Sequence, residues 1–248
     1  MILGIDRHVA ANCFQEINDS VQNILSGARD SRLVVFNAHN FTAPHRSIVF
    51  NLENVPGQVN PARWAGYEIW DASLRNISNY PVEMKVTHVP MGYEPTMKRF
   101  ERRPIEDRDI DVVFCGYLNE RRMSVLHSLR RRGIKVTVPE YDSWGKERDN
   151  VIARAKLALD MRYYDDGIFP TLRSLHLIAN GMPVVAETSP EMPPWILQNT
   201  SYEKLADLVE AMLTSEEEMN ALSLESEIIL KKHPLQLPSL MQHKHENE

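Results

Sequence analysis

The chain has 248 residues, 43% of them hydrophobic and 25% charged, with a formal net charge of −6. This length can bury one large core or two smaller ones. The acidic balance argues against a general polyanion-binding protein and leaves only a local basic patch for nucleic acid.

The cysteines and the start of the chain indicate a reducing compartment. Cys13 and Cys115 are the only cysteines and form no metal-type CxxC pair, so we expect a cytoplasmic protein. The first residues, MILGIDRHVAANC, combine a short apolar start with an early acid, unlike a signal peptide. No apolar run approaches the roughly 20 residues that span a membrane.

Short apolar runs and helix-like segments alternate along the chain, which predicts parallel sheets covered on both faces. A charged, proline-containing stretch over 97–110 is the best linker candidate, so we expect two such α/β units, split near residues 95–108. The predicted strands are 32–38, 47–53, 65–73, one that starts at 85 and ends at Pro90, 111–118, 134–140, 156–164 and 184–187. The predicted helices are 74–80, 119–133, 145–155, one within 167–181, and helices within 201–232.

The stretch GIFPTLRSLHLIANGMPVVAE, residues 167–187, reads as a turn, a helix, a glycine stop and a buried strand. Pro170 suits the first helical turn, whereas Phe169 before it is a poor N-cap. The first backbone N–H groups of this helix therefore lack an obvious partner, and Arg173 follows one turn later. Such a start is suited to an anion.

Two loops that follow predicted strands carry polar groups of the kind that bind phosphates. In CGYLNERR, Gly116 allows close backbone approach, and Asn119 and Arg121 lie at the helix start. In RYYDDGIFPTLR, paired tyrosines precede the uncapped helix. Because ligands bind beyond the carboxyl ends of parallel strands, the two loops together predict a cradle for a diphosphate with a flat base nearby.

Each of these features also has a purely structural interpretation. Arg122 and Arg130–Arg132 fit a solvated basic helix face, and Tyr163–Tyr164 fit core packing. Asp165–Asp166 could form a metal pair, but DDG is ordinary turn chemistry, which we favour. His176 has two equally good interpretations, a core histidine with hydrogen-bond partners inside the protein or a residue that contacts a ligand. The residues alone therefore indicate a two-lobed α/β protein with an anion site in the second lobe.

The order NLENVP…RWAGYEIWDAS…VTHVPMGYEP…DIDVVFCGYLNERRMSVLHSLRRRGIKV…RDNVIARAKLALDMRYYDDGIFPTLRSLHLIANGMPVVAE resembles the GT-B glycosyltransferases, in particular the group-1, CgeB-like branch of bacteria and phages. The resemblance covers roughly residues 47–213, and ANGMPVVAE is its most specific piece. It implies two Rossmann-like lobes, the N-terminal one short, and a nucleotide-sugar donor held without a metal or other cofactor. The implied division is an acceptor lobe at 1–95, a linker at 96–108, a donor lobe at 109–235 and a polar tail at 236–248.

The resemblance also assigns roles and exposes departures. It implies Thr171 and Arg173 as phosphate contacts, and His176 or Glu187 near the ribose or sugar. Retaining members often carry two glutamates eight residues apart, where this chain has Ile168 and His176. The full expected donor-binding set is Gly116, Asn119, Arg121, Tyr163, Tyr164, Phe169, Thr171, Arg173, His176 and Glu187.

The expected chemistry is glycosyl transfer in which the leaving diphosphate gathers negative charge. Helix N–H groups with Arg121 and Arg173 would stabilise that charge. An inverting enzyme also needs a base on the acceptor, for which Glu53 and His39 are the leading candidates beside His8 and His45. Glu53 has the alternative of a turn or helix cap. The resemblance leans toward retention, which needs no such base.

Three functions remain open from the sequence. The first is a nucleotide-sugar-dependent transferase with an unassigned acceptor, and the second is the same chemistry on a hydroxymethylated base in DNA. The basic stretches 98–103 and 130–132 allow DNA binding, and the net charge of −6 counts against it. The third is a non-catalytic nucleotide-sugar-binding protein that lacks the glutamates. The short first lobe also leaves room for a partner or second subunit.

Overall fold

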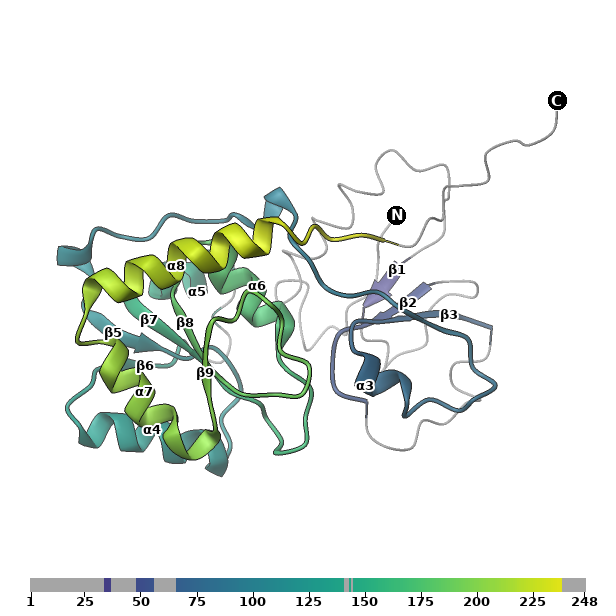
Figure 1. Ribbon diagram of the computed structural model, residues 1–248, viewed down its shortest axis with the longest axis horizontal. Helices are drawn as coiled ribbons and strands as arrows, with labels where there is room; N and C mark the ends of the chain where they lie inside the picture. Colours follow the sequence, from purple (N-terminus) through teal and green to yellow (C-terminus); the bar gives the residue numbers. More distant parts are fainter. Residues whose placement is uncertain (1–33, 37–47, 56–65, 141–142, 144, 238–248) are drawn as a thin grey trace. The chain divides into compact units, whose positions relative to one another are not determined.

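The computed structural model describes residues 34–36, 48–55, 66–140, 143 and 145–237 (Figure 1). Contacts divide the chain into two compact units, one comprising residues up to Thr96 together with those from Leu235, the other Met97–Pro234. Each unit is built on a parallel sheet, which confirms the predicted α/β class. None of the helices in the described ranges has the length and apolar character needed to cross a membrane.

The first unit contains a four-stranded parallel sheet of order β1-β2-β3-β4. Its apolar cluster includes Val49 and Ile69 from neighbouring strands, and the rings of Phe50 and Trp70 meet edge to face at 5.8 Å. The strands are β1 (Val34–Phe36), β2 (Ile48–Asn51), β3 (Glu68–Asp71) and β4 (Val86–His88), with the short helix α3 (Leu74–Ile77) before β4.

A buried carboxylate ties the carboxyl ends of β2 and β3 together. Asp71 accepts hydrogen bonds from Asn51 Nδ2 at 2.7 Å, Asn76 Nδ2 at 3.0 Å and the Tyr80 hydroxyl at 3.0 Å. The amides of Asn51 and Asn76 also donate to the backbone carbonyl of Glu53, each at 2.8 Å. The backbone that carries Glu53 is therefore fixed on the rest of the unit.

The second unit contains a five-stranded parallel sheet of order β6-β5-β7-β8-β9. From β5 the chain moves outward to β6 and then returns to β7 on the other side. The strand order therefore reverses between β5 and β7, the position at which open parallel sheets bind ligands. The strands are β5 (Ile110–Val113), β6 (Val136–Thr137), β7 (Ala155–Asp160), β8 (Val184–Glu187) and β9 (Gln198–Thr200).

Helices cover both faces of this sheet, with α4 and α7 on one side and α5, α6 and α8 on the other (Figure 1). Asn119 and Ser215 cap α4 and α8, because their side chains accept backbone N–H groups three residues on. The core residues on the α4 side include Phe114, Leu126, Leu157 and Val209. The helices are α4 (Glu120–Arg131), α5 (Lys146–Ala153), α6 (Thr171–Ala179), α7 (Leu205–Met212) and α8 (Glu216–Lys231).

Every predicted strand and helix overlaps an observed element of the same type. Strand β9 was not predicted, because Gln198–Thr200 contains no apolar residue and lies at the sheet edge. Residues after Met97, within the predicted linker, pack on the second unit: the N–H groups of Arg99 and Phe100 donate to Asn180 Oδ1 at 2.6 and 2.9 Å.

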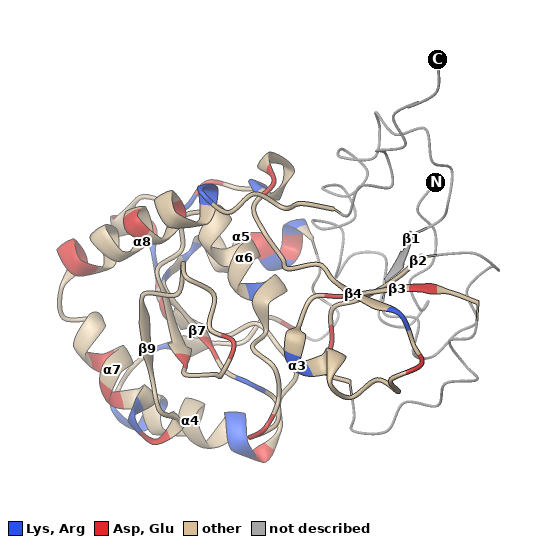
Figure 2. Cartoon of the chain, turned by 45° about the vertical axis from the view of Figure 1, so that its right-hand side comes forward, with Lys and Arg blue, Asp and Glu red and all other residues tan. Residues whose placement is uncertain are grey.

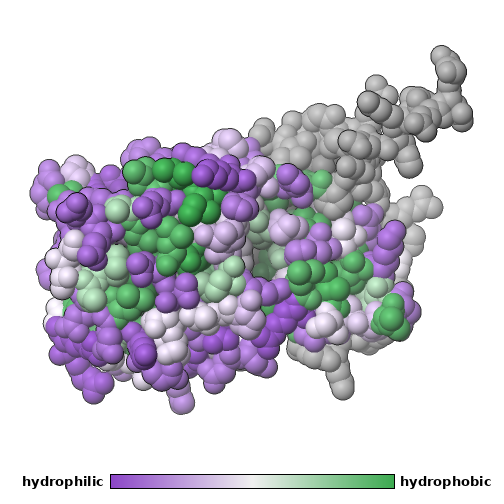
Figure 3. All heavy atoms as spheres, in the orientation of Figure 1, coloured by the Kyte–Doolittle hydropathy of each residue, from purple (hydrophilic) through white to green (hydrophobic). Residues whose placement is uncertain are grey.

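The surface of the second unit has distinct charged and apolar regions. Arginines lie near the two ends of α4, whereas acidic residues occupy the first turn of α8 (Figure 2). Further along α8, Leu224 and Ile228 are 61% and 45% exposed. Figure 3 shows an apolar area over this helix.

Two leucines on different helices test the assignment of the core. Leu126→Ala should lower the free energy of unfolding by about 2–5 kcal/mol, because the side chain is 1% exposed and its removal leaves a cavity. Leu224→Ala, which truncates an exposed leucine, should change it by about 0.5 kcal/mol or less. Urea unfolding of the full chain measures both, and equal losses would contradict the packing.

Candidate anion-binding site

Four arginines gather where β5, β7 and β8 end and where α4 and α6 begin. Arg121 and Arg122 open α4, Arg162 follows β7, and Arg173 lies in the first turn of α6. Their guanidinium groups donate hydrogen bonds to backbone carbonyls and carboxylates at the ends of these strands and in the loops that follow them. The arginine cluster, as we call these four residues, occupies the point at which the strand order reverses.

Arg173 pairs with a wholly buried carboxylate at the end of β7. Its Nε donates to Asp160 Oδ1 at 2.8 Å, and Nη2 reaches the same oxygen. Nη1 and Nη2 also donate to the carbonyls of Cys115 and Met161 at 2.6 and 2.9 Å. Burial raises the pKa of Asp160 even though Arg173 and Arg122 oppose the shift, and Oδ2 has no hydrogen-bond partner among the described residues.

Arg122 joins the same two strand ends through backbone carbonyls. It donates to Tyr117 O at 2.8 Å, Met161 O at 2.6 Å and Arg162 O at 3.1 Å. The residue is 4% exposed, and burial together with neighbouring Arg173 lowers its pKa to about 9. The interpretation of Arg122 as part of a solvated helix face is therefore wrong, because its guanidinium replaces water as the donor to three carbonyls.

Gly116 leaves the space that this arrangement needs. A Cβ atom there would lie 2.3 Å from Arg173 Nη1 and 3.3 Å from Arg122 Nη1. Any side chain would therefore displace the Arg173 guanidinium from the carbonyl of Cys115. This is a steric requirement for close approach, as the sequence predicted, although the approaching group here is an arginine of the chain itself.

Arg121 and Arg162 converge on Glu187 at the end of β8. Arg121 Nη1 donates to Glu187 Oε2 at 2.9 Å while Nη2 meets Oε1, so the contact is bidentate. Arg162 adds bonds from Nε at 3.1 Å and Nη2 at 2.5 Å, and its backbone N–H adds another at 3.1 Å. Asp165 contacts Arg121 at a different nitrogen, Nε. Although burial would lower it, these carboxylates together raise the pKa of Arg121.

Aromatic rings border the cluster. Tyr163 and Tyr164 are 39% and 55% exposed and meet edge to face at 4.8 Å, so the core-packing interpretation is wrong. The Arg122 guanidinium lies 5.1 Å from the Tyr163 ring centre, and the Arg121 guanidinium lies 4.1 Å from the ring centre of Tyr202. Exposed rings beside cations offer stacking surfaces for a planar group.

The remaining donor-side candidates occupy the two helix starts. Asn119 caps α4 and also donates from Nδ2 to Tyr163 O at 2.8 Å, which joins the two loops. No side chain caps α6 at Pro170, as expected from the sequence. The prediction that the first backbone N–H groups are left free is wrong for two of them, because the N–H groups of Thr171 and Arg173 donate to the carbonyls of Phe169 and Pro170 at 2.8 and 3.1 Å. Thr171 begins α6 and is half-buried, whereas Phe169 is buried, which makes a direct contact of its side chain with a dissolved ligand unfavourable.

His176 lies in the middle of α6 and contacts α5. Its Nε2 is 2.9 Å from Asp149 Oδ1 and 3.0 Å from Arg148 Nη2, and the residue is 6% exposed. The Phe100 ring packs against it at 5.8 Å. Of the two interpretations of His176, these contacts agree with a buried histidine that has hydrogen-bond partners within the protein. A role for His176 near a sugar stays a prediction.

Of the two leading base candidates, only Glu53 falls in the described part of the chain. Glu53 follows β2 with an exposed side chain, while its carbonyl is held by two asparagine amides. His39 lies outside the described residues, as do His8 and His45. Their roles therefore stay predictions.

Asp165 and Asp166 form part of a turn closed by Gly167 N–H donating to Tyr164 O at 3.2 Å. Asp165 pairs with Arg121, and within the described ranges no group of three or more potential ligands is placed to hold a metal ion. The preferred turn interpretation is confirmed for this pair.

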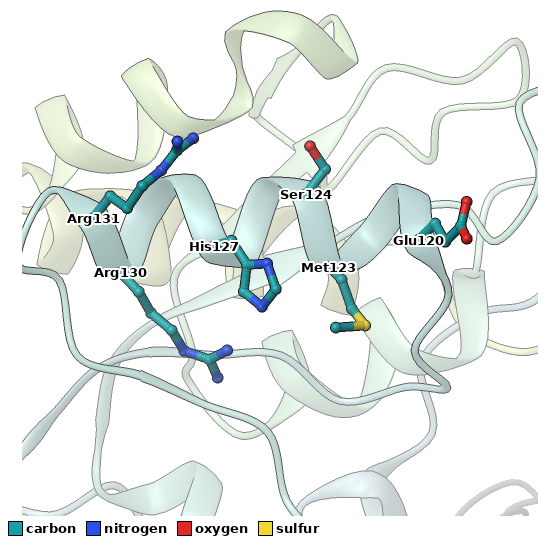
Figure 4. A pocket seen from close by; sticks show the side chains of 6 residues that line it. All are labelled: Glu120, Met123, Ser124, His127, Arg130 and Arg131. Carbon is teal, nitrogen blue, oxygen red and sulfur yellow. The ribbon is translucent and has the colours of Figure 1, made fainter.

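A separate open hollow lies along the outer face of α4. Figure 4 shows its lining side chains projecting from that one helix, and its volume is about 760 Å³. The residues are Glu120, Met123, Ser124, His127, Arg130 and Arg131. This confirms an exposed basic face at Arg130 and Arg131 and sets it apart from the arginine cluster.

Sequence reasoning missed two members of the site, Asp160 and Arg162. The sequence features that could have indicated them are the acid Asp160, which ends the apolar run KLALD, and Arg162 two residues later. Their partners lie 13 and 25 residues further along the chain. Only the strand order brings them together.

No protein-family model matches the sequence. The chain is 32% identical over 129 residues to "Uncharacterized protein L140" of Acanthamoeba polyphaga mimivirus, across 49% of this chain and 40% of that protein. It is 30% identical over 132 residues to "Uncharacterized protein L137" of the same virus, covering 17% of that protein. The chain thus spans less than half the length of these curated relatives.

Solved structures identify the architecture. TarM of S. aureus superposes with a TM-score of 0.54 at 9% identity, over 83% of this chain and 52% of that one. Sucrose-phosphate synthase from Thermosynechococcus elongatus gives 0.52 at 10% identity, over 87% and 72%. The fold is that of the GT-B glycosyltransferases. The CgeB-like branch within that fold stays a prediction.

The buried pair of Arg173 and Asp160 gives a pH-dependent prediction. Arg173→Met should lower the free energy of unfolding by about 3–5 kcal/mol at pH 8, because Asp160 keeps a buried charge without its partner. Without Arg173 the folded-state pKa of Asp160 rises further above its unfolded value, so the folded variant takes up a proton as the pH falls. The loss should therefore be smaller at pH 5 than at pH 8.

Urea unfolding at the two pH values measures this difference. Asp160→Asn in the Arg173→Met background is the control, since it removes the titrating group and should remove the pH dependence. An equal loss at both pH values would contradict the assignment.

Proposed function

We propose that this protein is a glycosyltransferase that moves a sugar from a nucleotide-sugar donor to an acceptor hydroxyl. The observation that carries the proposal is the arginine cluster at the strand-order reversal of a sheet with the GT-B fold. A diphosphate needs several positive groups at that edge, and four guanidinium groups lie there.

The four arginines have two different proposed roles, phosphate contact and support of the loops. The side chains of Arg121, Arg162 and Arg173 are 15%, 14% and 17% exposed, so each keeps a surface for a phosphate oxygen. Arg122 is buried and holds the loops on which the others lie. As the bond between sugar and diphosphate breaks, negative charge grows on the leaving group, and guanidinium groups already fixed by carboxylates stabilise it without rearranging.

The proposed chemistry is retaining and independent of metal. Guanidinium groups supply the positive charge that the leaving diphosphate requires, and a departing phosphate oxygen can accept the proton of the acceptor hydroxyl. Glu53 is the proposed base if the product is inverted, because its backbone is fixed and its carboxylate exposed. The anomeric configuration of the product, measured by NMR, decides between the two.

A second candidate function is nucleotide-sugar binding without transfer. The observation that favours it is His176, which stands at one of the two glutamate positions of many retaining members and is buried against Asp149. The other position is held by Ile168. Donor binding without hydrolysis or transfer would support this function.

A DNA acceptor would rely on few of the basic residues named in the sequence. In the stretch 98–103, Lys98 pairs with Glu101 at 3.3 Å, and the half-buried Arg102 donates to the carbonyls of Gly181 and Lys156 at 3.0 and 2.9 Å. The exposed basic face of α4 remains. A salt-dependence slope for binding of hydroxymethylated duplex would test this acceptor.

Two arginines on α4 provide a matched test of the donor site. Arg121→Ala should weaken binding of the donor nucleotide by about 1.5–3 kcal/mol, or roughly 10- to 150-fold, because a charged hydrogen bond to phosphate is lost. Arg131→Ala removes the same charge from the exposed face and should change the affinity little. Titration calorimetry with the donor selected by a thermal-shift screen of UDP-, GDP-, ADP- and dTDP-sugars measures both. Equal effects would place the donor elsewhere.

Metal independence is tested separately. Hydrolysis of the selected donor should continue at an unchanged rate in excess EDTA, because the proposed charge stabilisation comes from arginines. Loss of hydrolysis in EDTA with recovery on adding Mn²⁺ or Mg²⁺ would refute this point and return attention to Asp165 and Asp166.

A further inference from the structure

Arg121 is held between two carboxylates that differ sharply in burial. Glu187 is 1% exposed and pairs with its Nη1 and Nη2. The side chain of Asp165 is 89% exposed and pairs with its Nε. One carboxylate therefore lies on the interior side of the guanidinium and the other on the solvent side.

Glu187 is built into the protein. Besides the two bonds from Arg121 it accepts three from Arg162, including one from the backbone N–H. Removing it would leave two guanidinium groups without their buried partner, which is costly. Glu187 is thus a positioning residue that keeps Arg121 and Arg162 side by side.

Asp165 is held much more weakly. It lies in a solvent-exposed turn, and exposed ion pairs contribute only a small free energy because water and salt screen them. Its carboxylate nevertheless occupies the side of Arg121 from which a dissolved anion would approach. A diphosphate as a whole carries more negative charge than a single carboxylate and can replace it.

We propose that Asp165 occupies the ligand side of Arg121 in the unliganded protein and competes there with the phosphate groups of the ligand. Asp165 is therefore an affinity-determining residue of the site: it neutralises Arg121 until a diphosphate displaces it. Only the identity of the natural ligand rests on the proposed function, because the competition itself applies to any diphosphate anion.

The test uses inorganic pyrophosphate, without metal and at low ionic strength, with the full-length protein. Asp165→Asn should bind pyrophosphate about two- to fivefold more tightly than Asp166→Asn, the range expected for an exposed ion pair. Asp166 is the matched control, because it is an exposed acid in the same turn and its replacement changes the net charge equally. Titration calorimetry gives the affinities, and thermal unfolding verifies that both variants are folded.

Equal affinities in the two variants, or weaker binding in Asp165→Asn, would overturn the proposal, as would absence of pyrophosphate binding in all forms. The proposed function fails by a different result, namely absence of sugar transfer and donor hydrolysis in the wild-type protein. Tighter pyrophosphate binding in Asp165→Asn would stand even then.

Discussion

The second unit depends on how Arg122 and Arg173 close the gap between β5 and β7. Between them these two guanidinium groups donate to backbone carbonyls that follow both strands, where the parallel sheet itself supplies no further partners. Their charge is balanced in part by Asp160, which has no access to water. The position where a parallel sheet opens for a ligand is thus lined by fixed cations, and the positive charge of the proposed anion site follows from the way the sheet is completed.

The same constraint explains the division between permanent and replaceable contacts. Carboxylates at the strand ends, Asp160 and Glu187, are buried and hold arginines from the interior. Groups on the loop after β7, including Tyr163, Tyr164 and Asp165, are exposed. The strands therefore preorganise the charge, while the loop determines what reaches it from solvent.

Much of this architecture could be predicted from local sequence pattern, because alternating apolar runs and capped helices fix the elements. The absence of a side-chain cap at the start of α6 and the close approach at Gly116 could also be predicted from local sequence. The backbone carbonyls that accept the N–H groups of Thr171 and Arg173 could not. The burial of Arg122 could not, because its carbonyl partners include Met161 and Arg162, some 40 residues away. In the sequence alone, a buried arginine that donates to backbone carbonyls beyond a strand cannot be distinguished from a surface arginine.

Asn180, at the end of α6, has a consequence for where the second unit can be cut. Its side chain accepts from two backbone N–H groups of residues 99–100 and donates to the carbonyl of Met97 at 3.0 Å, and to that of His176 at 2.7 Å. A fragment that begins at residue 109 would leave this amide without three of its four partners, in a place where the residue is 1% exposed. The segment predicted to be a linker completes the second unit, and an expressible fragment of this unit has to include it.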